Sequence, residues 1–358
     1  MIELETRNHK IINAVIEKAD KVCPGALALI GIYGSFERGD FCESSDLDLL
    51  IVINDERGWQ LSCTFIQDDL DVGHDIYCTS WESLRKNALY NDPNIAKLLD
   101  SKIVYCSDEK YMNRLEELKE QARQKISQPL SWEDYLKAEN SLKEAEHFYS
   151  QAMTAEQLPD VFEQAGYAIY HMQNAVALLN KKYFRYGVNR AYEELEQMEN
   201  KLEGFCQSIE NVISGGSCEE VQTALTALLR ETVNVFKKAK QSLFAEKKPP
   251  TAETLRGTYE EMYSNWHNKM HTAAKENNRH LAFMSMTSLS AMFAEIKSET
   301  EIGEYNVFEN YYPQDLEKTA QAFDSLINGY LKEYQKTGLQ AERYRDIDEF
   351  TEKYSGRK

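Results

Sequence analysis

Hydrophobic and polar positions divide the chain into a mixed N-terminal part and a longer helical part. Apolar residues recur at helical spacing over residues 11–19, and Pro24-Gly25 ends the predicted helix. Short apolar runs beside turn residues predict strands at 26–33, 47–53, 71–79 and 103–106. From Ser131 onward the strand patterns almost vanish and helical periodicity takes over.

This order of elements predicts an α+β fold: a small mixed-sheet domain followed by a large all-α helical bundle. We expect the first domain to span residues 1–125, a helical bundle residues 131–247, and a further helical subdomain packed on the bundle residues 251–340. Ser131 precedes one helix, and Ser217 with Glu220 three residues later has the spacing of a capping box. Lys247-Lys248-Pro249-Pro250 interrupts the helical pattern, because proline cannot continue a helix.

Composition narrows the class of protein. The 358 residues carry a formal net charge of -18, which argues against a nucleic-acid partner because phosphate backbones need basic grooves. Seven scattered cysteines without a CxxC pair indicate a reducing compartment. The N-terminus lacks the apolar core of a signal peptide, and no apolar run approaches the roughly 18–20 residues of a membrane span. We therefore expect a cytoplasmic protein with no membrane partner.

The candidate chemistry lies in residues 33–53. Gly34-Ser35 follows an apolar strand, and Asp46-Leu47-Asp48 opens the next one after ten residues. Side chains two apart on a strand share a face, so the two carboxylates lie close together and repel each other unless a cation separates them. Magnesium, which proteins hold with one or two carboxylates plus substrate phosphates, is the expected ion.

Four nearby residues are suited to binding phosphate or ordering the acidic strand. Gly34 permits close approach of the backbone, and Ser35 offers a hydroxyl and a backbone N–H to an anion. Arg38 could reach a phosphate with its planar guanidinium or could pair with a neighbouring carboxylate, Glu37 or Asp40. Ser45 could order the start of the Asp46–Asp48 strand by hydrogen bonding.

The pattern of an apolar residue, Gly-Ser, ten residues and Asp-apolar-Asp-apolar resembles the nucleotidyltransferase superfamily of the DNA polymerase β type. Arg38-Gly39 and Ser45-Asp46 resemble its minimal and antibiotic-modifying members. The resemblance implies catalytic and metal-binding roles for Asp46 and Asp48, with a third carboxylate on a neighbouring strand. Asp75 is the best match for that role.

Two other aspartates are alternatives to Asp75. Asp71 and then Asp69 are the next candidates for the third carboxylate, which would complete the metal site or act as the base on the acceptor hydroxyl. Strand alternation places the adjacent His74 on the opposite face of the sheet, where a structural role is favoured.

The resemblance also implies the reaction and its cofactors. The expected activity is magnesium-dependent transfer of a nucleoside monophosphate, AMP from ATP, to a hydroxyl of a small molecule such as an aminoglycoside or lincosamide antibiotic. Alternatives are a protein adenylyltransferase, a non-catalytic nucleotide-binding regulatory module and a toxin-neutralising partner.

The helical half contains a second, weaker resemblance. Residues 167–184 are apolar on most sides and look like the central helix of the kanamycin-nucleotidyltransferase C-terminal or HEPN domains. This implies a helical domain that helps to form the acceptor pocket and supports a homodimer. Tyr170, His171 and Asn174 could face that pocket or be satisfied polar groups of the core. The Arg and His spacing of HEPN ribonucleases is missing.

His267 and His271 lie four residues apart on a predicted helix, a spacing that can bind a metal. Asn268 follows His267 where a zinc protease would have glutamate, and a packed or exposed pair is the simpler interpretation.

Overall fold

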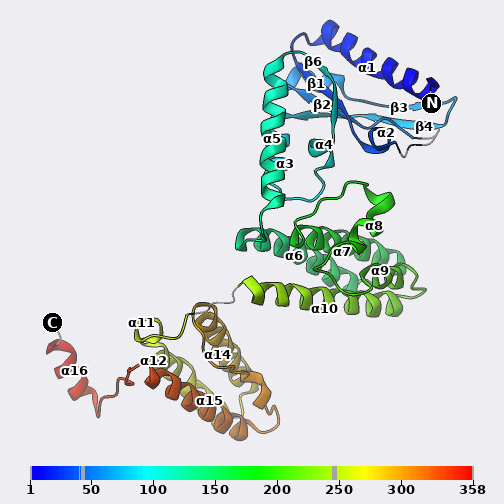
Figure 1. Cartoon of the computed structure of the whole chain (residues 1–358). Coiled ribbons are helices and arrows are strands. Elements are labelled where there is room, and N and C mark those ends of the chain that lie inside the picture. Colours follow the sequence, from blue (N-terminus) through cyan, green and yellow to red (C-terminus); the bar gives the residue numbers. More distant parts are fainter. Residues whose placement is uncertain (1, 40, 42–44, 244–247, 357–358) are drawn as a thin grey trace. The chain divides into compact units, whose positions relative to one another are not determined.

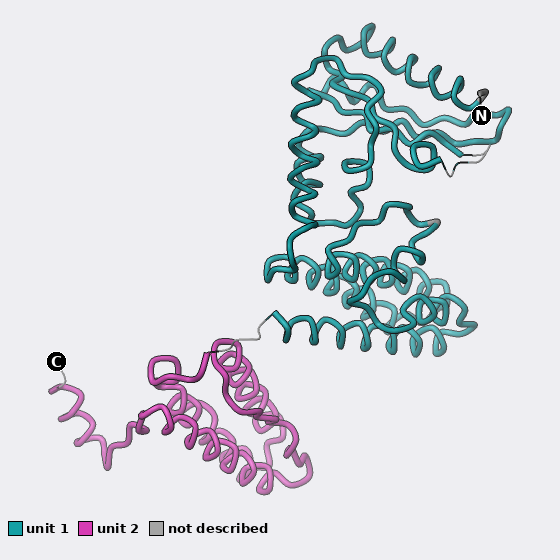
Figure 2. The backbone as a smooth tube through the Cα atoms, viewed as in Figure 1, with its two compact units in different colours: residues 1–243 teal, residues 244–358 magenta. Residues whose placement is uncertain are grey.

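The computed structural model describes residues 2–39, 41, 45–243 and 248–356, and the chain divides into two compact units, residues 1–243 and 244–358 (Figure 2). The first unit contains both the mixed sheet and a helical bundle (Figure 1). Lys247, the predicted end of the bundle, and Asp40, a candidate partner of Arg38, lie outside the described residues. The predicted packing of the 251–340 subdomain on the bundle stays a prediction.

The N-terminal part of the first unit has the predicted α+β layout. Its elements are α1 (Ile2–Val22), β1 (Leu27–Ile32), α2 (Gly34–Arg38), β2 (Leu49–Ile53), the 3₁₀ turn η1 (Glu56–Leu61), β3 (Cys63–Gln67), β4 (Val72–Ile76), β5 (Cys78–Ser80), α3 (Trp81–Ala88), α4 (Ala96–Leu99), β6 (Lys102–Cys106) and α5 (Glu109–Ser127). A four-stranded sheet has the order β5-β2-β1-β6, and β3 pairs with β4 in a separate hairpin. β1 is antiparallel to β2 and β6, and β2 is parallel to β5.

The central strands bury both faces, which is why they read as continuous apolar runs. On one face Ile30 and Ile51 pack with Val15 of α1 in one hydrophobic cluster. On the other face Leu29 and Leu50 belong to a cluster that includes α3, α4 and α5 and continues into the bundle. The sheet is therefore joined to the bundle by a shared core.

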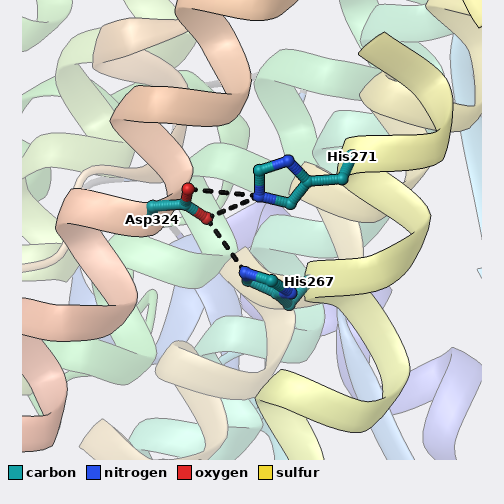
Figure 3. Close-up of side chains that lie close together, drawn as sticks. All are labelled: His267, His271 and Asp324. Carbon is teal, nitrogen blue, oxygen red and sulfur yellow. Dashed lines mark hydrogen bonds and ion pairs between the residues drawn. The ribbon is translucent and has the colours of Figure 1, made fainter. Parts of the chain in front are cut away.

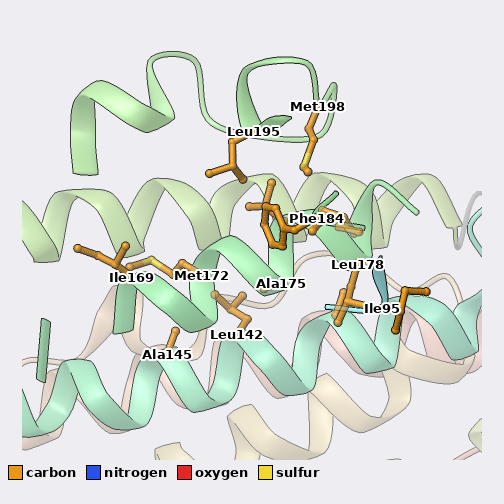
Figure 4. Close-up of a cluster of buried hydrophobic side chains, with 14 of the residues drawn as sticks. Ile95, Leu142, Ala145, Ile169, Met172, Ala175, Leu178, Phe184, Leu195 and Met198 are labelled. Carbon is orange, nitrogen blue, oxygen red and sulfur yellow. The ribbon is translucent and has the colours of Figure 1, made fainter. Parts of the chain in front are cut away.

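The described residues of the first unit continue with five α-helices and one 3₁₀ turn: α6 (Trp132–Thr154), α7 (Leu158–Leu179), η2 (Val188–Arg190), α8 (Ala191–Glu196), α9 (Phe205–Ile213) and α10 (Cys218–Leu243). The predicted apolar segment from residue 167 overlaps the C-terminal part of α7, where most of its side chains are buried but Tyr167 and Tyr170 are exposed. Ile169, Met172 and Leu178 of α7 lie in a cluster with Leu142 of α6 and Phe184 (Figure 4). The predicted helix starts at Ser131 and Ser217 are confirmed, since each side-chain oxygen accepts a hydrogen bond from the backbone N–H three residues later.

The second unit is helical and has its own core. Its elements are α11 (Ala252–Leu255), α12 (Thr258–Met262), the π-helical turn η3 (Tyr263–His267), α13 (Asn268–Glu276), α14 (Arg279–Glu299), the 3₁₀ turn η4 (Val307–Asn310), α15 (Leu316–Lys336) and α16 (Ile347–Gly356). Met270, Leu289 and Phe323 lie in this core and join α13, α14 and α15. None of the described helices in either unit is long and apolar enough to cross a membrane.

Candidate active site

The connection between β1 and β2 brings Gly34 against Asp48. The backbone N–H of Tyr33 donates to the carbonyl of Asp48 at 3.1 Å, directly beyond the last ladder pair of the two strands. Gly34 has a φ of +75°, and a Cβ built there would lie 1.8 Å from Oδ2 of Asp48. Glycine is therefore required for backbone conformation and for space.

β2 begins at Leu49, so the predicted strand 47–53 starts two residues later than expected, and Asp46 and Asp48 lie just before it, half-buried on either side of the buried Leu47. Burial, and then the neighbouring Asp46 carboxylate, raises the pKa of Asp48 to about 6, against the opposing effects of Arg38 and of a hydrogen bond from the backbone N–H of Ser35. Two acidic groups whose charges raise a pKa in this way form a site that favours a cation.

The pKa of Tyr33 is also affected by the acidic side chains of this site. Burial, followed by the charges of Asp48, Asp46 and Asp75, raises the pKa of Tyr33 to about 12. The Tyr33 hydroxyl is therefore protonated at neutral pH, and three acidic side chains act on one point of the molecule.

Arg7 of α1 contacts Ser45, the residue directly before the two aspartates. Its Nη2 donates to the carbonyl of Ser45 at 2.9 Å, and its Nη1 is buried with no hydrogen-bond partner among the described residues. Burial lowers the pKa of Arg7, while the charge of Asp46 raises it. Ser45 is expected to act by hydrogen bonding, and its backbone carbonyl accepts one such bond from Arg7, 38 positions earlier in the chain.

A cavity of about 770 Å³ opens beside the acidic pair. Its lining combines Gly34, Ser35, Ser45, Asp46 and Asp48 with residues from α4 and from the loop after α7. Four basic side chains line the same cavity: Arg38, Lys97, Arg185 and Arg190. Although the net charge of the protein is -18, four basic side chains lie beside the carboxylate pair.

Residues 184–190, which we call the basic loop, contribute most of the wall from the bundle. The carboxylate of Glu194 accepts from the backbone N–H of Arg185 at 2.7 Å and of Tyr186 at 3.1 Å. The guanidinium groups of Arg38 and Arg190 lie 5.1 Å and 4.2 Å from the centre of the Tyr186 ring. Arg38 also donates to the carbonyl of Arg185 at 3.2 Å, so the loop is held to the sheet domain.

A second cavity of about 560 Å³ adjoins the first and shares Asn94, Phe184, Gly187, Val188 and Arg190 with it. Its other lining residues lie on α7, α8 and α9: Ile169, Tyr170, Gln173, Asn174, Ala191, Tyr192, Glu193, Ile209 and Ile213. Most of this surface is apolar. The one carboxylate in the lining, Glu193, is paired with Arg190 at 2.6 Å.

Asp75 is exposed on β4 and does not line the larger cavity. The charge of Asp75 nevertheless contributes, after burial and the charges of Asp48 and Asp46, to the raised pKa of Tyr33. Among the described residues, Asp46, Asp48 and Asp75 do not bring three ligand atoms within 4.8 Å of one another. The role of Asp75 as third carboxylate stays a prediction.

The other candidates near Asp75 are placed differently. Asp69 and Asp71 lie in the exposed turn of the β3–β4 hairpin, where Asp71 has a φ of +50°. His74 is buried on the face of β4 opposite Asp75, where its ring stacks on Phe65 with centroids 4.8 Å apart and its Nε2 lies 3.1 Å from Oε1 of Gln67. These contacts give His74 the structural role that its position in the strand predicts.

The three polar residues of α7 that could face an acceptor pocket, Tyr170, His171 and Asn174, do not all line the same cavity. Tyr170 and Asn174 line the second cavity, where the amide of Asn94 lies 3.4 Å from the Tyr170 hydroxyl and 3.5 Å from Oδ1 of Asn174. His171 is not part of that lining and stacks on Phe148.

Sequence reasoning missed the residues that α1, the segment around α4 and the bundle contribute: Arg7, Asn94, Lys97, Arg185, Tyr186 and Arg190. No local motif marks them. The cluster of Tyr, Arg and Gly at 183–190 after a long apolar helix was the one available signal.

Comparison with known proteins agrees with this geometry. Residues 10–138 match the family model described as a nucleotidyltransferase domain. This part of the chain is a nucleotidyltransferase domain. It covers both strands of the Gly34–Asp48 site, together with Asp75, Asn94 and Lys97, and it supports nucleotidyl transfer as the general reaction of the protein.

The helices beyond residue 138 lie outside that match, so their resemblance to HEPN-type domains stays a prediction. Among solved structures, a nucleotidyltransferase-like protein from Exiguobacterium sibiricum 255-15 is similar at 12% sequence identity, with 72% of this chain and 89% of that chain covered. Its TM-score of 0.37 is too low to carry an argument. No curated protein matches the chain.

Proposed function

We propose that this nucleotidyltransferase moves AMP from ATP to a hydroxyl group of a small molecule, with magnesium as its metal. The observation that carries the proposal is a single cavity lined by a carboxylate pair and four basic side chains. A triphosphate with its divalent cation has the complementary charges, since it offers phosphate oxygens to the arginines and a cation to the carboxylates. The choice of ATP rests on the resemblance to antibiotic-modifying members.

Asp46 and Asp48 are the residues that would hold magnesium. Their fit is supported by the raised pKa of Asp48, which burial raises first and the neighbouring Asp46 carboxylate raises further. When bound, the metal supplies neutralisation of charge on the phosphate oxygens. The backbone N–H of Ser35 already donates to Asp48 and helps to fix the carboxylate in place.

The basic side chains would bind and orient the triphosphate. Arg38 and Arg190 are held by the ring of Tyr186, and Arg185 is held near Asp100 at 3.7 Å, so their guanidinium groups are partly ordered before a nucleotide binds. Burial lowers the pKa of Lys97, and a bound anion would favour its charged form. Catalysis of phosphoryl-type transfer relies mainly on such positioning and charge stabilisation.

The adjoining cavity is the proposed site of the acceptor. Its largely apolar lining and its single, already paired carboxylate favour an acceptor with an apolar skeleton over a polycation such as an aminoglycoside. Asn94 lies in both linings, so its amide is placed to hydrogen-bond a hydroxyl at the junction. In the reaction the acceptor oxygen bonds to the α-phosphorus, the bond to pyrophosphate breaks, and the hydroxyl proton passes to a base, for which Asp75 is the candidate.

The proposal is tested by incubating the full chain with each α-labelled nucleoside triphosphate, magnesium and cell extract, then separating small molecules from polypeptides. We expect label in the small-molecule fraction, greatest with ATP and accompanied by release of pyrophosphate. Label on a polypeptide would instead identify a protein adenylyltransferase. Nucleotide binding without transfer would identify a regulatory module.

Two variants make the test specific to the site. Asp48→Asn keeps the size of the side chain and removes its charge, and we expect it to reduce transfer by more than about 10²-fold. Asp68→Asn is the matched control, because Asp68 lies in the exposed hairpin turn. Equal transfer by wild-type and Asp48→Asn protein would overturn the assignment of the carboxylate pair.

A further inference from the structure

His267, His271 and Asp324 converge in the second unit, separate from the carboxylate pair of the first. His267 ends the π-helical turn η3 and His271 lies one turn later in α13, so both side chains lie on one face. Asp324 comes from α15, more than 50 residues further along the chain. Figure 3 shows both imidazole rings directed at the carboxylate of Asp324.

The distances within this group are those of residues that can share an ion. Nε2 of His271 lies 2.9 Å and 3.1 Å from the two oxygens of Asp324, and Nε2 of His267 lies 3.2 Å from Oδ1. The ligand atoms all lie within 4.8 Å of one another. Within the part of the chain that the structure describes, this is the one group of three or more His, Cys, Asp or Glu residues with such a spacing.

The contacts of His267 are compatible with a cation between its ring and the carboxylate of Asp324. Nδ1 of His267 lies 3.3 Å from Oδ1 of Asn268, an oxygen that accepts hydrogen bonds. A neutral imidazole donates from only one nitrogen. When Nδ1 donates to Asn268, Nε2 presents a lone pair to a carboxylate oxygen, and that contact is repulsive unless a proton or a metal ion lies between the two atoms.

The surroundings resemble those of metal-binding histidines. A ligating histidine commonly donates its second ring N–H to a nearby oxygen, which fixes the orientation of the ring, and Asn268 supplies that oxygen here. The ring of Tyr263 stacks on His267 with centroids 4.1 Å apart and further restricts it. The side chain of His271 is 45% exposed, so an ion can enter from solvent and a water can complete its coordination.

We propose that His267, His271 and Asp324 bind one divalent transition-metal ion, with Zn²⁺ as the best-suited occupant. Two imidazole nitrogens and one carboxylate oxygen are ligands that Zn²⁺ accepts, and three protein ligands leave its fourth position open. Asn268 stands where a zinc protease has its catalytic glutamate, so this site does not perform peptide hydrolysis in that manner. The ion ties α13 to α15 and stabilises the core of the second unit.

The test uses the full chain after removal of metals with a chelator. Titration with Zn²⁺ followed by calorimetry and elemental analysis should give one bound ion per chain, and Zn²⁺ should raise the melting temperature because it binds the folded state. Substitution of Co²⁺ should produce visible absorption typical of nitrogen ligands. The same titration on Asp46→Ala/Asp48→Ala protein keeps the result independent of the proposed magnesium site.

His271→Gln is the decisive variant, because glutamine can still donate a hydrogen bond to Asp324 and is a poor zinc ligand. We expect it to lose the bound ion and the Co²⁺ absorption while its far-ultraviolet circular dichroism stays that of the wild type. His280→Gln, at an exposed histidine of α14, should retain both. Wild-type protein that takes up no Zn²⁺, or a His271→Gln variant that takes up as much as the wild type, would overturn the proposal.

Discussion

At the scale of single residues, the approach of Gly34 to Asp48 decides whether the carboxylate pair can form. We predict that Gly34→Ala abolishes transfer, since the added methyl group would overlap Oδ2 of Asp48 at 1.8 Å and must displace it. A left-handed conformation costs a non-glycine residue roughly 1–2 kcal/mol as well. Transfer rates and urea unfolding of the variant measure the two effects.

Gly39→Ala is the matched control for that variant. Gly39 has a similar φ of +82°, but a Cβ there meets no described atom within 4 Å. It should lose stability by a similar backbone strain and keep most of its activity. Equal loss of activity in both variants would show that strain, and not the overlap with Asp48, is responsible.

The third carboxylate can also be tested at the residue scale. Asp75→Asn should reduce transfer by more than about 10²-fold if Asp75 completes the metal site or acts as the base. Asp71→Asn should leave the rate unchanged, and asparagine tolerates the positive φ of that turn. The transfer rates of both variants are measured at saturating nucleotide. A loss of activity in Asp71→Asn, with an unchanged rate in Asp75→Asn, would identify Asp71 as the third carboxylate.

At the scale of elements, a buried ion pair joins the start of α6 to the turn after α7. Nζ of Lys181 lies 2.6 Å from Oδ2 of Asp134, and each side chain is 9% exposed. Burial alone would raise the pKa of Asp134, but hydrogen bonds from Lys181 and Ser131 outweigh it and lower the pKa. The stability that Asp134 contributes is therefore present above the ordinary pKa of aspartate and is lost as the pH falls through the lowered value.

We predict that Lys181→Met destabilises the first unit by about 3–5 kcal/mol, because it leaves a buried carboxylate without its partner. Lys182→Met is the matched control, since Lys182 is exposed. Urea unfolding followed by circular dichroism compares the two variants. A loss no greater for Lys181→Met than for Lys182→Met would contradict the importance of the buried pair.

Elements with a strong local sequence pattern could be predicted from the sequence. Elements that depend on pairing with another segment of the chain could not. The apolar runs gave β1 and β2, and the serine caps gave the starts of α6 and α10. β3 was missed because its side chains are largely exposed and it is held by pairing with β4. The strand predicted at 71–79 is divided between β4 and β5, which belong to different sheets.

At the scale of the whole molecule, the site combines segments that are distant in sequence. The Gly34–Asp48 half could be predicted because its residues lie within one strand–turn–strand segment. The basic loop at 184–190 could not, because its position beside Arg38 depends on the packing of the bundle against the sheet domain. The overall negative charge gave no sign of this local cluster of cations.

The central claim is that the acidic pair and the basic loop bind one nucleotide together with its metal. The most direct measurement is a crystal structure of the full chain with Mn²⁺ and an ATP analogue that cannot be cleaved at the α-phosphate, with the metal located by anomalous scattering. We predict manganese in contact with Asp46 and Asp48 and the triphosphate beside Arg38, Arg185 and Arg190. Nucleotide bound elsewhere in the molecule, or manganese away from both carboxylates, would contradict the claim.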